Sequence, residues 1–195
     1  MAAFEERYAT RLPLRAQHAI LGAFWHTEGG PLNQVIHVSP DDDLQQRTAV
    51  RDALASDAAR AQIPSGRECV VAQEAESMLP APGMHPLGSR NYGTGTVDEM
   101  RTSTFAPGDL PQVLAGWGQA LEAREPFSPL AACGTSEFGG LNTFVHTWVD
   151  KDLHERARVR EEARRAGGPW PPRTGVRPIR QANKLLSPAA FSPVR

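Results

Sequence analysis

The sequence predicts an α+β protein made of two tandem copies of one β-α-β-β-α-β unit, the ferredoxin-like arrangement. Three observations support this prediction. A set of residues recurs at a constant spacing of 109 positions, the second half of the chain shows the complete order of elements, and the first half shows that order without its opening strand. We expect the first unit at residues 1–80, a linker at 81–91 and the second unit at 92–195.

The internal repeat is the strongest of these signals. Nine residues between positions 28 and 51 return 109 positions later. They are Glu28, Gly30, Leu32, Asn33, His37, Asp43, Leu44, Arg47 and Arg51, matched by Glu137, Gly139, Leu141, Asn142, His146, Asp152, Leu153, Arg156 and Arg160. The register then continues with one residue lost, so that Pro80 matches Pro188. The pattern indicates a duplication.

The second unit contains every expected element. Residues 97–104 alternate as in a strand, and Pro107 and Gly108 punctuate its end. Apolar residues at helical spacing predict a helix over 109–124. Gly139 and Gly140 join two short apolar runs into a hairpin. The ranges for the hairpin strands, the second helix and the last strand are 130–137, 142–148, 153–166 and 176–185, with Asp152 as the helix cap.

The first unit is incomplete at its start. The same reasoning gives the end of a helix at 4–15, followed by a hairpin at 20–38, a helix at 43–58 and a strand at 67–78. No opening strand precedes this helix. Either the chain starts upstream of Met1, or this half leaves a sheet edge whose unpaired backbone groups invite pairing.

Composition excludes several classes of function. The formal net charge of −1 gives no field that would attract nucleic acid or an anionic membrane, so neither partner is expected. No apolar stretch approaches the ~20 residues of a membrane-spanning helix. Cys69 and Cys133 do not form a C-x-x-C pair, so we expect two reduced thiols and neither a metal site nor a cofactor. The expected location is the cytoplasm.

Several segments resemble the NIPSNAP family. They are residues 22–28, residues 30–37, the Asp-Leu-x-x-Arg-x-x-x-Arg run at 43–51, residues 73–80, and residues 100–108 in the second copy. The resemblance covers nearly the whole chain as two units. One departure is Gly134, which stands in the second copy at the position of Trp25.

The resemblance implies a dimeric α/β-barrel fold, in which two ferredoxin-like units join their sheets into a barrel-like body. It implies no particular reaction, because NIPSNAP proteins share no established activity. Animal members are similar to mitochondrial adaptor or scaffold proteins. Related barrel families include haem-binding monooxygenases, chlorite dismutases, and small cyclases and isomerases, so the function has to be argued from the site.

His37 and His146 are the candidate catalytic residues. A histidine at a strand end facing a cavity can act as a general base or ligate a haem iron. Because both histidines occupy matched positions, a shared structural role, pinning the strand to the following helix, is the alternative that we favour.

The candidate ligand-binding residues are arginines, glutamates and tryptophans. Two arginines four residues apart lie on one helical face and can grip a carboxylate, or they can pair with the acids of the hairpin. Glutamates act as acid–base groups only where they are buried beside a cavity. Tryptophans line a ligand cavity or pack in a core. The set is Trp25, Glu28, Arg47, Arg51, Glu137, Trp148, Arg156 and Arg160.

Three functional hypotheses follow. The first is a protein that binds a small anionic or aromatic molecule in a cavity between the sheets, with or without acid–base catalysis by a histidine. The second is a non-catalytic protein-interaction module, and the third is a haem-binding protein similar to a monooxygenase. A polar cavity would favour the first, and a cavity filled by its own side chains the second. Self-association into a homo-oligomer is expected because the incomplete first half needs a cover.

Overall fold

The computed structural model describes residues 1–195 except residues 64, 91 and 94–96. Residue 91, the last of the predicted linker, and residues 94–96, near the start of the predicted second unit, therefore lie outside the description. The elements are α1 (Ala2–Arg15), β1 (Ala23–Gly29), β2 (Val35–Val38), α2 (Leu44–Ser56), two 3-10 turns η1 (Ala58–Gln62) and η2 (Arg67–Cys69), β3 (Ser77–Pro80), β4 (Val97–Thr104), α3 (Leu110–Arg124), β5 (Leu130–Phe138), β6 (Thr143–Asp150), α4 (Leu153–Arg165) and β7 (Arg180–Pro188).

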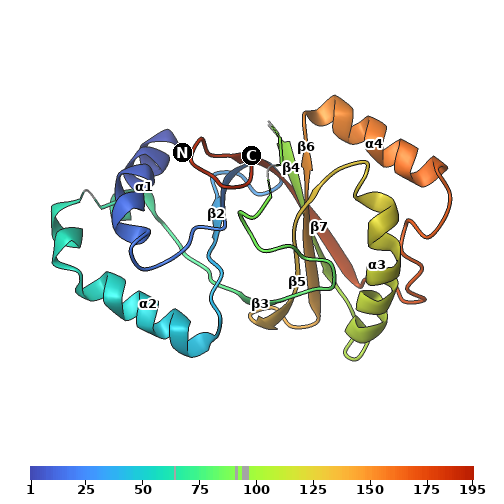
Figure 1. Cartoon of the computed structure of the whole chain (residues 1–195), viewed down its shortest axis with the longest axis horizontal. Helices are drawn as coiled ribbons and strands as arrows, with labels where there is room; N and C mark the ends of the chain where they lie inside the picture. Colours follow the sequence, from blue (N-terminus) through green and yellow to red (C-terminus); the bar gives the residue numbers. More distant parts are fainter. Residues whose placement is uncertain (64, 91, 94–96) are drawn as a thin grey trace.

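The strands form one curled antiparallel sheet with the order β2-β1-β7-β4-β6-β5-β3. Figure 1 shows α1 and α2 toward one end of this sheet and α3 and α4 toward the other. Within the described chain, β2 and β3 are the two edges and do not pair with each other. The protein therefore has the mixed α and β structure that the sequence predicts, built on a sheet that is open at this point.

The repeated residues form equivalent local structures in the two halves. Asp43 caps α2 by accepting a hydrogen bond from the Gln46 amide, and Asp152 caps α4 in the same way through Glu155. The hairpin residues Asn33 and Asn142 both adopt a positive φ, 59° and 56°, a conformation that asparagine tolerates better than most residues. Sequence identity between the copies thus reflects the capping and turn geometry.

Two predicted strands are displaced, and both displacements have the same cause. The strand expected at 67–78 is wrong for most of its length, because η2 occupies Arg67–Cys69 and only Ser77–Pro80 is extended in the sheet. Ser77 lies opposite Phe138, the last residue of β5, so the residues before Ser77 have no strand to pair with. Likewise β7 starts at Arg180, opposite Thr104 at the end of β4, rather than near residue 176.

Strand pairs between the two halves hold the sheet together. β1 pairs with β7, which places Trp25 opposite Pro188, and β3 pairs with β5, which places Pro80 opposite Gly134. Each pair contains one irregularity, in β1 between Thr27 and Gly29 and in β3 next to Ser77. The last strand of each half therefore lies beside the first hairpin strand of the other half.

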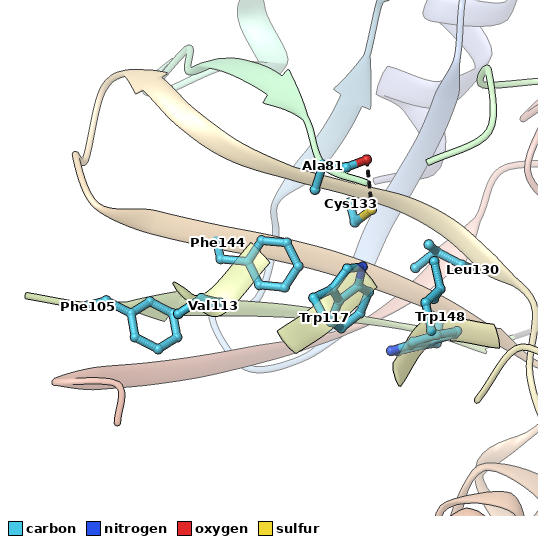
Figure 2. Packing of buried hydrophobic residues seen from close by; sticks show 9 residues of the cluster. Ala81, Phe105, Val113, Trp117, Leu130, Cys133, Phe144 and Trp148 are labelled. Atoms are coloured by element: carbon cyan, nitrogen blue, oxygen red, sulfur yellow. Dashed lines mark hydrogen bonds between the residues drawn. The ribbon is translucent and has the colours of Figure 1, made fainter. Parts of the chain in front are cut away.

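Two apolar clusters cover the two faces of the sheet. Under α3, the ring of Trp117 lies between Phe144 and Trp148, with centroid distances of 4.8 and 5.8 Å (Figure 2). The opposite face, called the inner face below, carries the buried residues Ala23, Trp25, Tyr92, Ala131, Val149, Leu186 and Val194. In contrast, neither α1 nor α2 contains a buried residue.

Candidate functional site

His146 lies in the apolar core beneath α3. Its ring is 4.8 Å from Trp117, 5.5 Å from Phe144 and 6.2 Å from Trp148, measured between centroids. Burial, together with nearby arginine charges, lowers the pKa of His146 to about 3. The imidazole is therefore neutral at physiological pH. It is half-buried and packs against aromatic rings, an environment suited to packing and unsuited to proton transfer.

His37 has the equivalent position in the first half, but it is exposed to solvent whereas His146 is half-buried. It lies on β2 opposite Phe24 and 5.6 Å from the ring of Tyr8 on α1. Burial and then the charge of Arg15 lower the pKa of His37. Both predicted histidines thus lie between a hairpin and the helix that precedes it in the chain.

Arg156 and Arg160 converge on Glu99, a residue that the sequence analysis did not single out. Arg156 donates a hydrogen bond to Glu99 at 2.5 Å, and Arg160 contacts both carboxylate oxygens at 3.0 and 2.8 Å. Arg101 and Asn183 donate further hydrogen bonds, and Glu99 is only 3% exposed. Burial raises the pKa of Glu99, but these donors outweigh it and hold the pKa at about 2. The two arginines are thereby occupied within the protein.

Arg47 and Arg51, the matched pair on α2, have a different environment. Within the described part of the chain, neither guanidinium forms a hydrogen bond or an ion pair, and Arg51 is exposed. Glu28, one of their expected partners, instead accepts a hydrogen bond from His26 at 2.8 Å and is largely exposed. Glu137 is also exposed. Among the described residues, a carboxylate therefore meets the Arg156 and Arg160 pair and not the Arg47 and Arg51 pair.

Trp25 is fully buried on the inner face and is bonded to a second buried acid. Its indole nitrogen donates to Asp98 Oδ2 at 2.5 Å, and Asp98 has no exposed surface. Burial raises the pKa of Asp98 to about 7, although the Trp25 hydrogen bond acts in the opposite direction. Asp98 Oδ1 has no partner among the described residues. A carboxyl group that titrates near neutral pH is a recognised property of functional sites.

Trp148 is a core residue with a buried arginine stacked on it. The Arg124 guanidinium lies 4.4 Å from the ring centroid and donates to Ser128, which in turn donates to Asp150 at 2.6 Å. This arrangement satisfies part of the charge of Arg124 inside the protein. Trp148 therefore contributes to packing and presents no surface to a ligand.

Two pockets are present near these residues. One, of about 150 Å³, is lined by Arg101, Gln181, Ala182 and Asn183. The other, of about 250 Å³, is lined by residues at the end of β6 and around it, including Tyr92, Phe127, Val149, Asp150 and Glu155. None of the ten predicted site residues lines either pocket. The inner face around Trp25 is filled by the protein's own side chains.

Neither a metal-binding cluster nor a membrane-spanning helix is present in the described part of the chain. Residues 1–63, 65–90, 92–93 and 97–195 contain no group of three or more His, Cys, Asp or Glu side chains placed to hold a metal ion. Across the same ranges, no helix is both long and apolar enough to cross a membrane.

Comparison with known proteins assigns the family. The NIPSNAP family model matches residues 1–83 and 98–193, which together span most of the chain. The chain belongs to the NIPSNAP family. The resemblance found in residues 22–51, 73–80 and 100–108 is thereby confirmed.

The relatives of this NIPSNAP protein are distant. It is 28% identical over 139 residues to the Protein NipSnap homolog of Dictyostelium discoideum. The aligned region covers 71% of this chain and 60% of that relative, so this chain spans less than two thirds of the relative's length. It is 28% identical over 212 residues to the human Protein NipSnap homolog 3A, covering the whole of this chain and 81% of the relative.

Two solved structures match part or most of this chain. An uncharacterized NIPSNAP-like domain protein from Burkholderia xenovorans is 25% identical, with a TM-score of 0.46, over 52% of this chain and 91% of its own. A candidate monooxygenase from Fusobacterium nucleatum is 8% identical, with a TM-score of 0.56, over 96% of this chain and 85% of its own. At that identity, the second likeness concerns the fold alone.

Proposed function

We propose that this NIPSNAP protein is a non-catalytic interaction module made of two units that share one sheet. The two halves differ in how far their strands are paired and how many helix residues are buried, and this contrast carries the proposal. The first half leaves the sheet edges β2 and β3 unpaired in the described chain, and its two helices bury no residue.

The two-unit organisation is supported by the pairing between the halves. Trp25 and Gly134 are 109 positions apart, and their partners Pro188 and Pro80 are 108 apart, the same offsets as in the sequence repeat. The pairs Thr27 with Leu186 and Ser136 with Met78 follow the same rule. A pseudo-twofold arrangement of two related units accounts for all of these registers.

The difference in burial between the helices supports an interaction surface. In the second half, α3 buries five residues, and α4 buries Val159 and Ala163. In the first half, Met78 on β3 is 36% exposed whereas its counterpart Leu186 on β7 has no exposed surface, and Leu79 beside it is also exposed. Exposed apolar groups next to unpaired strand edges are typical of surfaces that bind other polypeptides.

A site-specific photo-crosslinker tests this function. We would place it at Leu79 on β3 and, as a matched control, at Glu162 on the exposed face of α4, in cells that express the full chain. A defined crosslinked partner that depends on the Leu79 position supports the proposal. Equal labelling from both positions, or none from Leu79, would contradict it.

A second candidate function is the binding of a small molecule in the pocket of about 250 Å³ that Tyr92 and Val149 line beside the filled inner face. Asp98, which lies opposite Val149 in the sheet, is the observation that favours it. A carboxyl with a pKa of about 7 is suited to donating or accepting a proton at neutral pH. Native mass spectrometry of the purified wild type and of Asp98→Asn tests this candidate. A small molecule retained by the wild type and lost from the variant would support it, and two empty proteins would exclude it.

The visible absorption spectrum of the same samples tests the haem hypothesis. The enclosure of His146 by three aromatic rings argues against a bond from this residue to a haem iron. We expect no Soret band from added haem that depends on His146, and a band lost in His146→Ala with retained fold would overturn this expectation.

A further inference from the structure

We propose that the pocket of about 150 Å³ on β4 and β7 binds a small oxyanion, the carboxylate or phosphate group of a small molecule, through Arg101, Gln181 and Asn183. The pocket lies beside the buried Glu99, on the face of the sheet that α4 covers. It is distinct from the sheet edges and from the pocket of about 250 Å³, so it does not depend on either function proposed above.

Strand alternation places the side chains of this pocket. In β4, Glu99, Arg101 and Ser103 are two residues apart and therefore point to the same face. In the pairing with β7, Asn183 lies opposite Arg101, and Gln181 lies opposite Ser103. Arg101 and Asn183 both donate hydrogen bonds to Glu99, at 3.1 and 3.2 Å. Gln181 donates to Ser103 at 3.2 Å. The two strands thus hold the pocket residues in one row beside Glu99.

The hydrogen-bond donors around Glu99 outnumber the acceptor sites that it offers. Its Oε2 atom accepts from Arg160 alone, whereas its Oε1 atom accepts from Arg101, Arg156, Arg160 and Asn183. Since a carboxylate oxygen has about two lone pairs, Oε1 has more donors than it can satisfy. In addition, the Arg156 Nε is buried and has no partner among the described residues. A second acceptor beside this cluster would relieve the competition.

The same cluster has a surplus of positive charge. The guanidinium groups of Arg101, Arg156 and Arg160 all form ion pairs with the Glu99 carboxylate, and no other acid among the described residues pairs with them. Burial lowers the pKa of Arg160; Glu99 opposes this effect, and the charges of Arg101 and Arg156 add to it. A partly buried site with this imbalance favours an anion over a neutral ligand.

The residues that line the pocket supply mainly hydrogen-bond donors. Arg101 uses its Nε for Glu99, and its two terminal nitrogens have no partner in the part of the chain that the structure describes. The side-chain amides of Gln181 and Asn183 each use one hydrogen, and an amide NH2 group carries a second. A guanidinium group binds a carboxylate or a phosphate through two parallel hydrogen bonds. The donor set therefore matches an oxyanion.

The size and exposure of the pocket limit the ligand to a small one. About 150 Å³ is well below the ~300 Å³ at which pockets for drug-sized ligands begin. The Arg101 side chain is 32% exposed, and Gln181 and Asn183 are exposed as well. A small anion can therefore enter from solvent without a change of fold.

Titration of the full chain with inorganic phosphate, and separately with acetate, tests the site. Sodium chloride keeps the ionic strength constant, and backbone amide NMR signals follow binding. We expect saturable shifts concentrated at residues 101 and 181–183, and the stronger of the two probes identifies the preferred group. Arg101→Gln should weaken binding about tenfold or more, since it removes a charged hydrogen-bond donor. Gln181→Ala should weaken it less. The control Arg158→Gln, which changes an exposed arginine of α4, should bind as the wild type does.

Glu99→Gln provides a second readout, in which the anion produces a gain. This substitution removes the negative charge of the cluster and enlarges its positive surplus. Phosphate should therefore raise the melting temperature of Glu99→Gln by more than it raises that of the wild type. In Arg158→Gln, phosphate should have the same effect as in the wild type.

Three results would overturn the anion site. The first is no saturable binding of either probe at tens of millimolar by a chain whose circular dichroism is native. The second is equal binding by the wild type, Arg101→Gln and Gln181→Ala, which would indicate unspecific association. The third is equal stabilisation of Glu99→Gln and the wild type by phosphate. If Arg101→Gln does not fold, Gln181→Ala decides, because Gln181 is bonded to Ser103 and not to Glu99.

Discussion

Two adjacent acids, Asp98 and Glu99, have opposite electrostatic behaviour because a strand directs them to opposite faces of the sheet. Glu99 points toward α4, where guanidinium groups compensate for its burial. Asp98 points to the inner face, where the single hydrogen bond from the Trp25 indole does not compensate for its burial. The two side chains are similarly buried, at 3% and 0% exposure, so the difference in pKa comes from the partners.

Asp98 should make the protein less stable as the pH rises. Its pKa is about 7 in the folded protein against 3.8 for the unfolded chain, so its contribution is most favourable below pH 3.8 and is lost as the pH rises toward 7. Asp98→Asn should therefore gain stability relative to the wild type between pH 5 and pH 8, by up to about 3 kcal/mol. Urea denaturation at both pH values measures this difference. The exposed substitution Asp41→Asn is the control, and an equal effect of Asp98→Asn at both pH values would contradict the prediction.

Glu99 should be required for stability at neutral pH. Glu99→Gln leaves Arg101, Arg156 and Arg160 close together without a neutralising charge, and such losses cost about 3 kcal/mol or more. Glu161→Gln on the exposed face of α4, which also removes a partner of two arginines, should cost less than about 1 kcal/mol. Thermal or chemical denaturation of the two variants gives the comparison, and similar losses would refute it.

The sequence predicted only part of the candidate site. The repeat pointed to residues that occur twice, and the structure places the two histidines between hairpin and helix in both halves. Asp98 and Glu99 lie in a strand that has no counterpart among the described residues of the first half, so a search for matched residues could not find them. The one signal in the sequence for these residues was that two adjacent acids occur in a predicted strand. Their partners could not be predicted, because they come from elements that are distant in sequence.

At the scale of elements, α2 and α4 have similar sequences and different environments. Both begin at an aspartate cap and carry an arginine pair four residues apart. α4 packs on β6 and approaches β4 through Glu99, whereas α2 buries no residue. Local sequence therefore determines that each helix forms, and the neighbouring strand determines how firmly it is held.

Backbone amides should exchange faster with solvent in α2 than in α4. A helix with little buried surface opens locally at low free-energy cost. Hydrogen–deuterium exchange followed by mass spectrometry on the free chain compares the two directly, since the helices are both 13 residues long. Equal protection would mean that α2 is covered in solution, for example by self-association.

The elements themselves were largely predictable from periodicity, caps and turn residues. The predicted 97–104 strand coincides with β4, and the predicted helices agree closely with α1 to α4. The starts of the strands predicted at 67–78 and 176–185 were not predictable from local sequence, because each strand begins only opposite the last residue of its antiparallel partner. The pairing of β1 with β7 also joins segments too far apart for local patterns to reveal.

At the scale of the whole molecule, the two halves are connected by strands more than by the linker. β1 pairs with β7 and β3 with β5, while residues such as Ala81 and Leu87 between the halves pack against the two apolar clusters. A cut in the linker therefore leaves most of the inter-half hydrogen bonds in place.

A protease site inserted between Gly88 and Ser89 should not separate the halves once it is cleaved. Both residues are exposed, so the cut disturbs little packing. We expect the cleaved protein to elute as a single species in size-exclusion chromatography and to unfold in a single transition. An uncleaved sample with the same insertion is the control, and elution of two independent fragments would show that the units fold separately.

The pairing of β1 with β7 also has a consequence for synthesis on the ribosome. Residues 23–29 are made more than 150 residues before their partners at 185–188. Sheets built from such distant segments fold slowly, and their unpaired edges are prone to aggregation until the partner arrives. For most of translation the nascent chain therefore exposes Trp25 and its neighbours, which makes this segment a natural target for the chaperones that bind apolar stretches until a protein is complete.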